Sequence, residues 1–297
     1  MKAKILNPAA SRLCLGTVQF GLAYGLANQK GRMSLADAGE ILRLAHSANI
    51  GFLDTAIAYG EAEAVLGQLG ASDFAITSKL PPFPQDQEPS TWMRQEIAQA
   101  LQRLNCEKLH ACLLHRASDL LGPQGGSLYQ SLRQLRDDGL VQNIGISIYH
   151  PSELDGLPQD MQFNAVQFPY NVLDREIAHS GWLDRLKDRG IETQARSVFL
   201  QGLLLMAPEK RPAYFQPWQN LLQAWDEFLK AHGLCALTAA MGHVLADARV
   251  DRLVIGVDNA AHLQQIIEAM PDQPVFLPET LRSQDQALIH PGHWKLT

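Results

Sequence analysis

The stretch FLDTAIAYGEAEAVLGQL, residues 52–69, decides how the rest of the chain is interpreted. Its first part, residues 52–56, is short and largely apolar, which is typical of a buried β-strand. Residues 61–69 then show the spacing of apolar side chains expected of a helix that covers a sheet. The stretch therefore predicts one strand followed by one helix, with a short turn between them.

The same alternation of strand and helix recurs along the whole chain. A Gly-rich loop with Gly21 and Gly25 follows the first strand, and a longer irregular stretch over residues 199–217 interrupts the second half. The predicted strands are residues 13–17, 52–56, 74–80, 109–115, 143–148, 165–169, 192–198 and 253–257. The predicted helices are a segment opened by Ser34 and residues 61–69, 91–104, 128–137, 152–157, 178–188, 218–231, 237–246 and 261–270.

Eight apolar strands separated by helices indicate an α/β fold with a parallel sheet that is covered on its outer face. That number favours a closed (β/α)8 TIM barrel, formed as one domain over residues 1–297, because no linker or compositional break divides the chain. An open doubly wound sheet is the alternative. Such a sheet normally carries a GxGxxG phosphate loop after its first strand, and residues 16–21 do not have that spacing.

The composition excludes several classes of protein. Hydrophobic residues make up 46% of the 297 residues and charged residues 19%, which is enough to build a sizeable core. The net charge of −6 leaves no positive excess for binding nucleic acid, and no apolar run is long enough to span a bilayer. The four cysteines lack the spacing of a disulfide framework or metal site. We therefore expect a cytoplasmic protein that binds neither nucleic acid nor membrane.

Polar side chains stand at the carboxyl ends of three neighbouring predicted strands. Asp54 lies near the end of the second strand, Tyr59 just after it, Lys79 in the third and His115 at the end of the fourth. Taken singly, each has an ordinary explanation as a turn acceptor, a packed ring, an extended lysine or a hydrogen-bonded histidine. Because the ends of barrel strands converge on one mouth, the four groups together indicate a site for acid–base chemistry.

The four groups suit proton donation by a phenol. A tyrosine has a pKa near 10, and a neighbouring ammonium is expected to lower that pKa by stabilising the phenolate. Asp54 would keep the buried Lys79 charged and in place. A neutral His115 could then hydrogen-bond to a substrate carbonyl oxygen and orient it.

The sequence resembles the aldo-keto reductases over nearly its whole length. The segment from Asp54 to Glu63 is the most specific part of the match. The other segments that carry the resemblance are Thr77-Ser78-Lys79, Leu113-Leu114-His115, Gly145-Ile146-Ser147, Gln167-Phe168-Pro169-Tyr170-Asn171 and Ile255-Gly256-Val257.

The resemblance implies a barrel enzyme that reduces aldehydes or ketones to alcohols with a nicotinamide cofactor, usually NADP(H). Asp54, Tyr59, Lys79 and His115 would be its catalytic tetrad, with Tyr59 protonating the oxygen as hydride reaches the carbonyl carbon. No metal is implied, and the ten histidines show no HxH or HExxH grouping.

The resemblance also predicts cofactor contacts, position by position. Ser147 and Gln167 have an alternative explanation as ordinary hydrogen-bonding residues of packed strands, and residues 199–217 could be a surface loop or a flap over the pyrophosphate. Tyr170 is predicted to be the ring that stacks on the nicotinamide. The predicted contacts are Gly16, Thr17, Ser147, Gln167, Tyr170, Ser197, Leu200, Gln201, Gly202 and Gly256.

The sequence departs from the family pattern at two points. Ser147 is followed by Ile148, where relatives often have an Asn that helps to hold the carboxamide. Asp258 stands where NADPH-binding relatives commonly carry a lysine or arginine for the 2′-phosphate. A carboxylate there would repel phosphate and could bind a free ribose hydroxyl, so NAD(H) becomes possible, although His262 or the nearby helix N-terminus could still bind a phosphate.

The substrate, the oligomeric state and the role of the tail after Met270, which we expect to be irregular, stay open. Five aromatic residues could line a substrate pocket or simply pack: Tyr24, Phe83, Trp92, Phe199 and Trp218. The leading interpretation is a reductase of small-molecule carbonyl compounds. The alternative is a cofactor-sensing regulatory protein on the same barrel, because a fold and a tetrad do not guarantee turnover.

Overall fold

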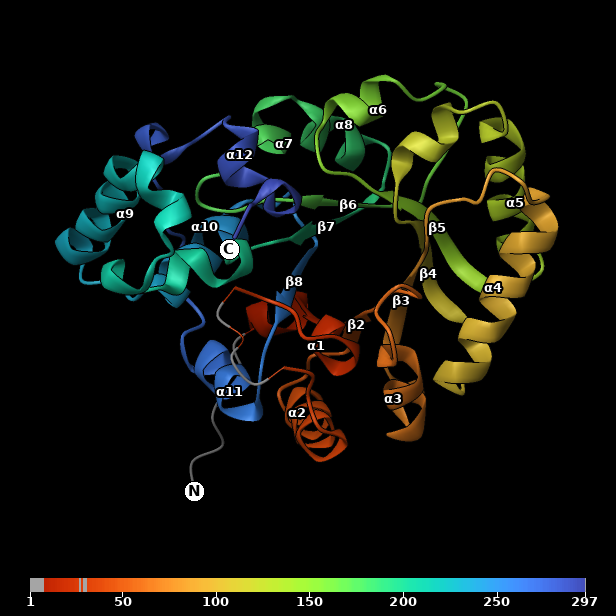
Figure 1. Cartoon of the computed structure of the whole chain (residues 1–297), viewed down its shortest axis with the longest axis horizontal. Coiled ribbons are helices and arrows are strands. Elements are labelled where there is room, and N and C mark those ends of the chain that lie inside the picture. The colour runs from red at the N-terminus through yellow and green to blue at the C-terminus, as the bar shows by residue number, and fades with distance from the viewer. Residues whose placement is uncertain (1–7, 27, 29–30, 297) are drawn as a thin grey trace.

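Eight parallel strands close into a barrel at the centre of the molecule (Figure 1). The structure, a computed structural model, describes residues 8–26, 28 and 31–296. The strands pair in chain order, and β8 pairs back onto β1 to close the sheet. This arrangement confirms the predicted (β/α)8 barrel, while the two ends of the expected 1–297 domain, residues 1–7 and residue 297, lie outside the described part.

All eight predicted strands are present, and their ends differ from the predicted ones by no more than two residues. Sequence identifies them well because strands covered on both faces are nearly continuous apolar runs. The strands are β1 (Leu13–Gly16), β2 (Phe52–Asp54), β3 (Ala75–Leu80), β4 (Leu109–Leu114), β5 (Val141–Ser147), β6 (Ala165–Pro169), β7 (Glu192–Arg196) and β8 (Arg252–Gly256).

The helices form a ring around the barrel (Figure 1). Several begin at a side chain that caps them: the Ser34 hydroxyl accepts from the Asp37 amide, and the Asn259 side chain accepts from the His262 amide. The α-helices are α1 (Val18–Gly21), α2 (Leu35–Ser47), α3 (Ala62–Gln68), α4 (Pro89–Leu104), α5 (Gly125–Asp137), α6 (Ser152–Asp155), α7 (Glu176–His179), α8 (Trp182–Asp188), α9 (Gln219–His232), α10 (Ala236–Ala246), α11 (Ala260–Glu268) and α12 (Gln286–Ile289).

The predictions for four helical or irregular segments need correction. The predicted helix over residues 178–188 is two helices, α7 and α8, because Gly181 between them has a left-handed φ of 78°. The Gly-rich loop after β1 contains one helical turn, α1, and the tail contains α12. Residues 199–217 contain 3₁₀ turns at Leu200–Leu205, Pro208–Lys210 and Ala213–Trp218.

The described helices do not include a single one that is long and apolar enough to cross a membrane. Ala213–His232 and Ala236–Ala246 reach that length and hydropathy only as a pair, which is bent by 94°.

The base of the barrel interior is closed by side chains that meet across it. The Arg252 guanidinium lies 3.4 Å from the centroid of the Phe52 ring, and the His110 ring packs edge-on against Phe52 at 5.3 Å. His110 also lies 3.4 Å from the Glu192 carboxylate. These residues come from four different strands, so the interior is sealed at the amino end of the sheet and a cavity can form only at the carboxyl end.

The interior above this layer is narrow and requires small residues. Ala111, Leu113 and Ala165 form a buried cluster between β4 and β6. On β5, which lies between those strands, a Cβ placed on Gly145 would come within 2.0 Å of the Ala165 carbonyl oxygen and 2.7 Å of the Leu113 side chain. The absence of a side chain at Gly145 therefore lets these strands close.

We predict that Gly145→Ala lowers the free energy of unfolding by about 3 kcal/mol, because the added methyl group overlaps backbone atoms that cannot move independently. Urea unfolding followed by circular dichroism measures the change. The control is Gly126→Ala on the exposed face of α5, where an added Cβ meets nothing within 4 Å. It should raise the free energy of unfolding by up to about 1 kcal/mol. Equal effects of the two substitutions would contradict this account of the barrel.

Candidate active site

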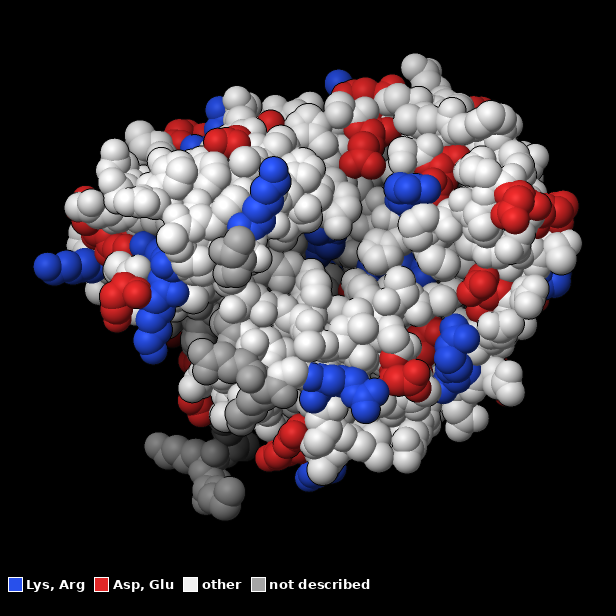
Figure 2. All heavy atoms as spheres, in the orientation of Figure 1, with Lys and Arg blue, Asp and Glu red and all other residues white. Residues whose placement is uncertain are grey.

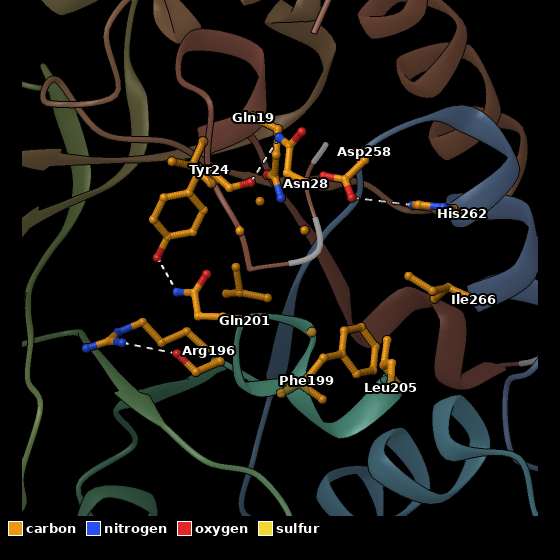
Figure 3. A pocket seen from close by; sticks show the side chains of 18 of the residues that line it. Gln19, Tyr24, Asn28, Arg196, Phe199, Gln201, Leu205, Asp258, His262 and Ile266 are labelled. Atoms are coloured by element: carbon orange, nitrogen blue, oxygen red, sulfur yellow. Dashed lines mark hydrogen bonds and ion pairs between the residues drawn. The ribbon is translucent and has the colours of Figure 1, made fainter. Parts of the chain in front are cut away.

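A cavity of about 730 Å³ opens at the carboxyl ends of the strands. Figure 2 shows the hollow at the centre of this face, and Figure 3 shows the side chains around it. Catalytic and binding residues of such barrels come from these strand ends. Twelve of the sixteen predicted site residues line the cavity: Gly16, Thr17, Asp54, Tyr59, His115, Gln167, Ser197, Gln201, Gly202, Gly256, Asp258 and His262.

A buried ion pair lies at the bottom of the cavity. The Lys79 ammonium donates to both carboxylate oxygens of Asp54 at 2.7 Å and to the Thr55 carbonyl oxygen at 2.8 Å. The Gln167 side chain adds a 2.7 Å hydrogen bond to the same carboxylate. Burial lowers the pKa of Lys79, but Asp54 and Tyr59 raise it by more, so the pKa lies above its ordinary value and the lysine stays charged.

Tyr59 lies above this pair in the turn after β2. The Lys79 nitrogen is 5.1 Å from the centroid of the Tyr59 ring, and the Tyr59 and His115 ring centroids are 6.0 Å apart. The backbone of Tyr59 is held from behind by Gly21 on α1, where a Cβ would come within 1.7 Å of the Tyr59 carbonyl oxygen. The predicted acid, phenol, ammonium and imidazole are therefore brought together in one site.

The sign of the pKa shift at Tyr59 differs from our prediction. Burial raises the pKa of its hydroxyl above the ordinary value, and the lowering by Lys79 and Arg196 does not overcome that effect. The predicted lowering is therefore wrong for the protein without ligands. A raised pKa keeps Tyr59 protonated at neutral pH, which is the state that a proton donor needs.

His115 is held in its neutral form. Burial, together with the positive charges of Lys79 and Arg196, lowers the pKa of His115 to about 4. At neutral pH its imidazole therefore carries no charge and can take part in a hydrogen bond with a carbonyl oxygen.

The model of the aldo/keto reductase family matches residues 12–281 of the chain. The chain belongs to this family.

The chain is similar to known reductases at low sequence identity. It is 26% identical to the 6-dehydroglucose reductase of Novosphingobium aromaticivorans over 257 residues, which cover 79% of this chain and 81% of the relative. It is 24% identical to the L-glyceraldehyde 3-phosphate reductase of Escherichia coli O157:H7, covering 89% and 88% of the two chains. The solved holo form of aldo-keto reductase AKR11C1 from Bacillus halodurans shares its fold with a TM-score of 0.69 at 18% identity, covering 89% and 88%.

Two buried glutamines at the cavity of this reductase have unused acceptors. The side-chain oxygens of Gln19 and Gln167 have no hydrogen-bond partner among the described residues. Gly256 lies against Gln19, and a Cβ there would come within 2.9 Å of its side-chain nitrogen. Unpaired buried acceptors and a position without a side chain are the features of a surface that receives a polar ligand.

Four predicted site residues do not line the cavity. Lys79 is buried beneath the cavity against Asp54, and Ser147 is buried at the end of β5. Leu200 is buried in the core. The Tyr170 ring, predicted to stack on the nicotinamide, is buried beside α10, so in this conformation it is not presented to the cavity.

The contacts of Tyr170 explain its orientation. Its ring lies edge-on to His243 at 5.5 Å, and its hydroxyl is 3.5 Å from the Asp247 carboxylate. Burial and the charge of Asp247 raise the pKa of this hydroxyl to about 12. Tyr170 therefore joins β6 to the outer helices.

The backbone after β7 is strained where it borders the cavity. Ser197, Leu200 and Gln201 have left-handed φ values of 59°, 45° and 56°, and Gly202 has 94°. A side chain in this region costs on the order of 1–3 kcal/mol, and such strain concentrates at functional sites. Buried Leu200 packs into the core and holds the segment in place, so that Ser197, Gln201 and Gly202 line the cavity.

The far end of the cavity carries an acidic residue. The Asp258 carboxylate lies 3.7 Å from the His262 ring, and burial raises the pKa of Asp258 above its ordinary value (Figure 3). Among the described residues, no group of three or more His, Cys, Asp or Glu is placed to hold a metal ion.

Sequence reasoning missed Arg196 and Tyr149, which both line the cavity. Arg196 could have been found from the sequence, because it is a polar residue at the carboxyl end of a strand, β7, as Asp54 and Lys79 are of theirs. Tyr149 stands two residues beyond β5 and carries no comparable signal. The structure thus adds a cation and an aromatic ring to the predicted site.

The predicted aromatic candidates divide into two groups. Tyr24 and Phe199 line the cavity. Phe83 and Trp92 are buried against one another with ring centroids 5.1 Å apart, and Trp218 packs beside Tyr214. Only the first two are therefore placed to meet a ligand.

The tail after Met270 reaches the mouth. Buried Arg175 donates to the carbonyl oxygens of Leu277 and Pro278, which fixes the tail to the barrel. Beyond this anchor, the His290 ring stacks on Tyr149 at 4.1 Å, and Trp294 lines a second cavity beside the first. The tail therefore builds part of the wall of the site.

We predict that His115 and the half-buried His243, whose pKa is also lowered to about 4, do not titrate between pH 7.5 and 5.5. NMR of the ring protons measures this, with signals assigned from His115→Asn and His243→Asn. In the unfolded chain each of these histidines has a pKa near 6.5, and in the folded chain its pKa is lower. The neutral form therefore favours folding above pH 6.5. This contribution, up to about 3 kcal/mol, is lost as the pH falls to 4.

The free energy of unfolding tests the same prediction. The difference in the free energy of unfolding between wild type and His243→Asn should change between pH 6.5 and 4. The difference is the right quantity because Asp174, whose pKa burial raises to about 7, makes an opposite contribution that is common to both proteins. Ring signals that titrate near pH 6.5 would show that the two histidines are solvated.

Proposed function

We propose that this protein is an NAD(P)H-dependent reductase that converts a small aldehyde or ketone into an alcohol, with Tyr59 as the proton donor. The observation that carries the proposal is the buried Lys79–Asp54 ion pair beneath Tyr59, with the neutral His115 in the same cavity. Such a set is costly to bury for stability alone, because desolvating two charges offsets much of their attraction.

Each residue of the set has a distinct task. Bound nicotinamide would supply the hydride that forms the new C–H bond. The electron pair of the carbonyl bond moves onto oxygen, and Tyr59 gives that oxygen its proton. The positive charge of Lys79 stabilises the phenolate left on Tyr59, and Asp54 keeps Lys79 protonated. His115 holds the carbonyl oxygen by a hydrogen bond.

Residues of this chain fit the cofactor along the cavity. The unpaired oxygen of Gln167 is placed to accept from an amide such as the carboxamide of nicotinamide. Gln19 and Gly256 provide a polar surface without side-chain obstruction. Asp258, at the opposite end from Arg196, is suited to accept from a ribose hydroxyl (Figure 3).

The relatives support a polar substrate. The printed names of two of them, 6-dehydroglucose reductase and L-glyceraldehyde 3-phosphate reductase, describe sugar-derived carbonyl compounds. We therefore propose small, oxygen-rich aldehydes and ketones as the substrate class.

We predict that Tyr59→Phe lowers kcat for aldehyde reduction by about a thousandfold or more, because proton donation is lost while the ring remains. The measurement is the loss of absorbance of NADH and NADPH with a panel of aldehydes. Cofactor affinity, followed by fluorescence titration, should change by less than about threefold.

The matched control for this experiment is Tyr129→Phe. Tyr129 hydrogen-bonds to the backbone of Gln162 through its hydroxyl and does not line the cavity. Its loss should alter stability and leave kcat unchanged. Full activity of Tyr59→Phe would overturn the assigned proton donor, and tight cofactor binding without turnover of any aldehyde would favour a sensor.

We predict that NADH is used at least as well as NADPH, because the Asp258 carboxylate would repel a 2′-phosphate. Asp258→Asn should raise kcat/KM for NADPH by about tenfold and change the value for NADH by less than about threefold. Asp272→Asn, an exposed tail position outside the cavity, is the control. A strong preference of the wild-type enzyme for NADPH is the result that contradicts this prediction.

A further inference from the structure

Arg196 stands at the mouth of the cavity, at the end opposite Asp258 and next to Gln201 (Figure 3). It is the last residue of β7 and lines both the main cavity and a second cavity of about 390 Å³ that continues outward to the tail. Among the described residues that line the main cavity, it is the one lysine or arginine. Its position therefore makes this end of the site positive.

The guanidinium of Arg196 is held in a fixed position. It donates to the Ile148 carbonyl oxygen at 3.0 Å and to the Ser197 hydroxyl at 3.3 Å. One face lies over the Tyr149 ring at 4.3 Å, Tyr149 stacks on His290 at 4.1 Å, and His290 stacks on His293 at 4.1 Å. We call these four side chains, Arg196, Tyr149, His290 and His293, the rim stack.

Arg196 forms no ion pair within the described residues, where no carboxylate lies within 4 Å of its guanidinium. Asp54 is paired with Lys79, and Asp258 lies beside His262 at the other end of the cavity. The buried Asp174 carboxyl interacts with Arg196 over a longer distance, and burial raises the pKa of Asp174 to about 7, so that it offsets only part of the positive charge at neutral pH. Lys or Arg atoms are visible within the central hollow in Figure 2.

The bonding capacity of Arg196 is also only partly used. A guanidinium has five N–H donors in a planar fork, and two hydrogen bonds to protein atoms are present here. A fixed guanidinium that has free donors and no carboxylate within ion-pair distance is the arrangement that binds carboxylate or phosphate oxygens. The neighbouring side chain of Gln201 donates to the Tyr24 hydroxyl, so polar atoms also lie beside Arg196.

We propose that Arg196 is an oxyanion-binding residue that selects substrates carrying a carboxylate or phosphate group at the end of the molecule away from the reacting carbonyl. This inference rests on the proposed function, since it places the carbonyl at Tyr59 and His115. The second cavity provides space for the charged end of the substrate. His290 of the rim stack packs on Tyr149, which in turn lies against Arg196. The substrate class is thus narrowed to anionic aldehydes and ketones.

The test uses pairs of aldehydes in which one member carries an anionic group and the other is neutral. The carboxylate pair is 4-oxobutanoate and 4-oxobutanamide, and the phosphate pair is glyceraldehyde 3-phosphate and glyceraldehyde. The variants are Arg196→Gln, which removes the charge, and Arg196→Lys, which keeps it. Arg43→Gln, at an exposed position of α2 outside the cavity, is the control.

Wild type should prefer the charged member of at least one pair, and that pair identifies the anion. Arg196→Gln should lower kcat/KM for that substrate by about 10- to 100-fold, mainly through KM, and change the neutral partner by less than about threefold. Arg196→Lys should restore part of the loss, and added salt should weaken the preference. Equal losses on charged and neutral substrates would overturn the proposal, because they would place Arg196 against the cofactor or the fold.

Equilibrium binding separates this proposal from the proposed function. Calorimetry with succinate and succinamide, which are not reduced, measures the anion site without turnover. Tighter binding of succinate that is lost in Arg196→Gln supports the oxyanion site even if no aldehyde is reduced. Equal binding of the two compounds refutes it even if neutral aldehydes are reduced rapidly.

Discussion

The buried ion pair between Lys79 and Asp54 is the interaction on which the rest of the site depends. Three strands meet at it, since Asp54 ends β2, Lys79 belongs to β3 and Gln167 reaches the same carboxylate from β6. Removing one member would leave a buried, unpaired charge at the bottom of the cavity, which costs several kcal/mol. The pair can persist because the barrel is sealed below it and small residues let the strands close around it.

Burial, more than the ion pair, explains how one cavity can hold a phenol and an imidazole that are both uncharged. Burial raises the pKa of Tyr59 and lowers that of His115, so both groups keep the form that interacts with a neutral carbonyl. The positive charge lies underneath, at Lys79, and a second one lies at the rim, at Arg196. The site is therefore neutral where the carbonyl would bind and charged on either side of it.

The sequence was sufficient for the barrel and for the four central residues. Buried parallel strands are apolar runs, and strand ends must converge, so Asp54, Lys79 and His115 could be placed together without coordinates. Side chains just beyond a strand escape this logic. Tyr170 follows β6 by one residue and points to α10, because its direction is set by packing against His243 and Asp247. The left-handed backbone after β7 and the path of the tail depend on tertiary contacts in the same way.

The tail places a tryptophan, Trp294, at the mouth of the site. Trp294 lines the second cavity, donates its indole N–H to the Leu288 carbonyl oxygen and packs edge-on against Phe215 at 4.8 Å. Of the five tryptophans, it is the one that borders either cavity within the described residues. We therefore expect its emission to respond to a ligand that enters the second cavity, and the emission of the other four tryptophans to change less. Occupancy of this region becomes visible in an unlabelled protein.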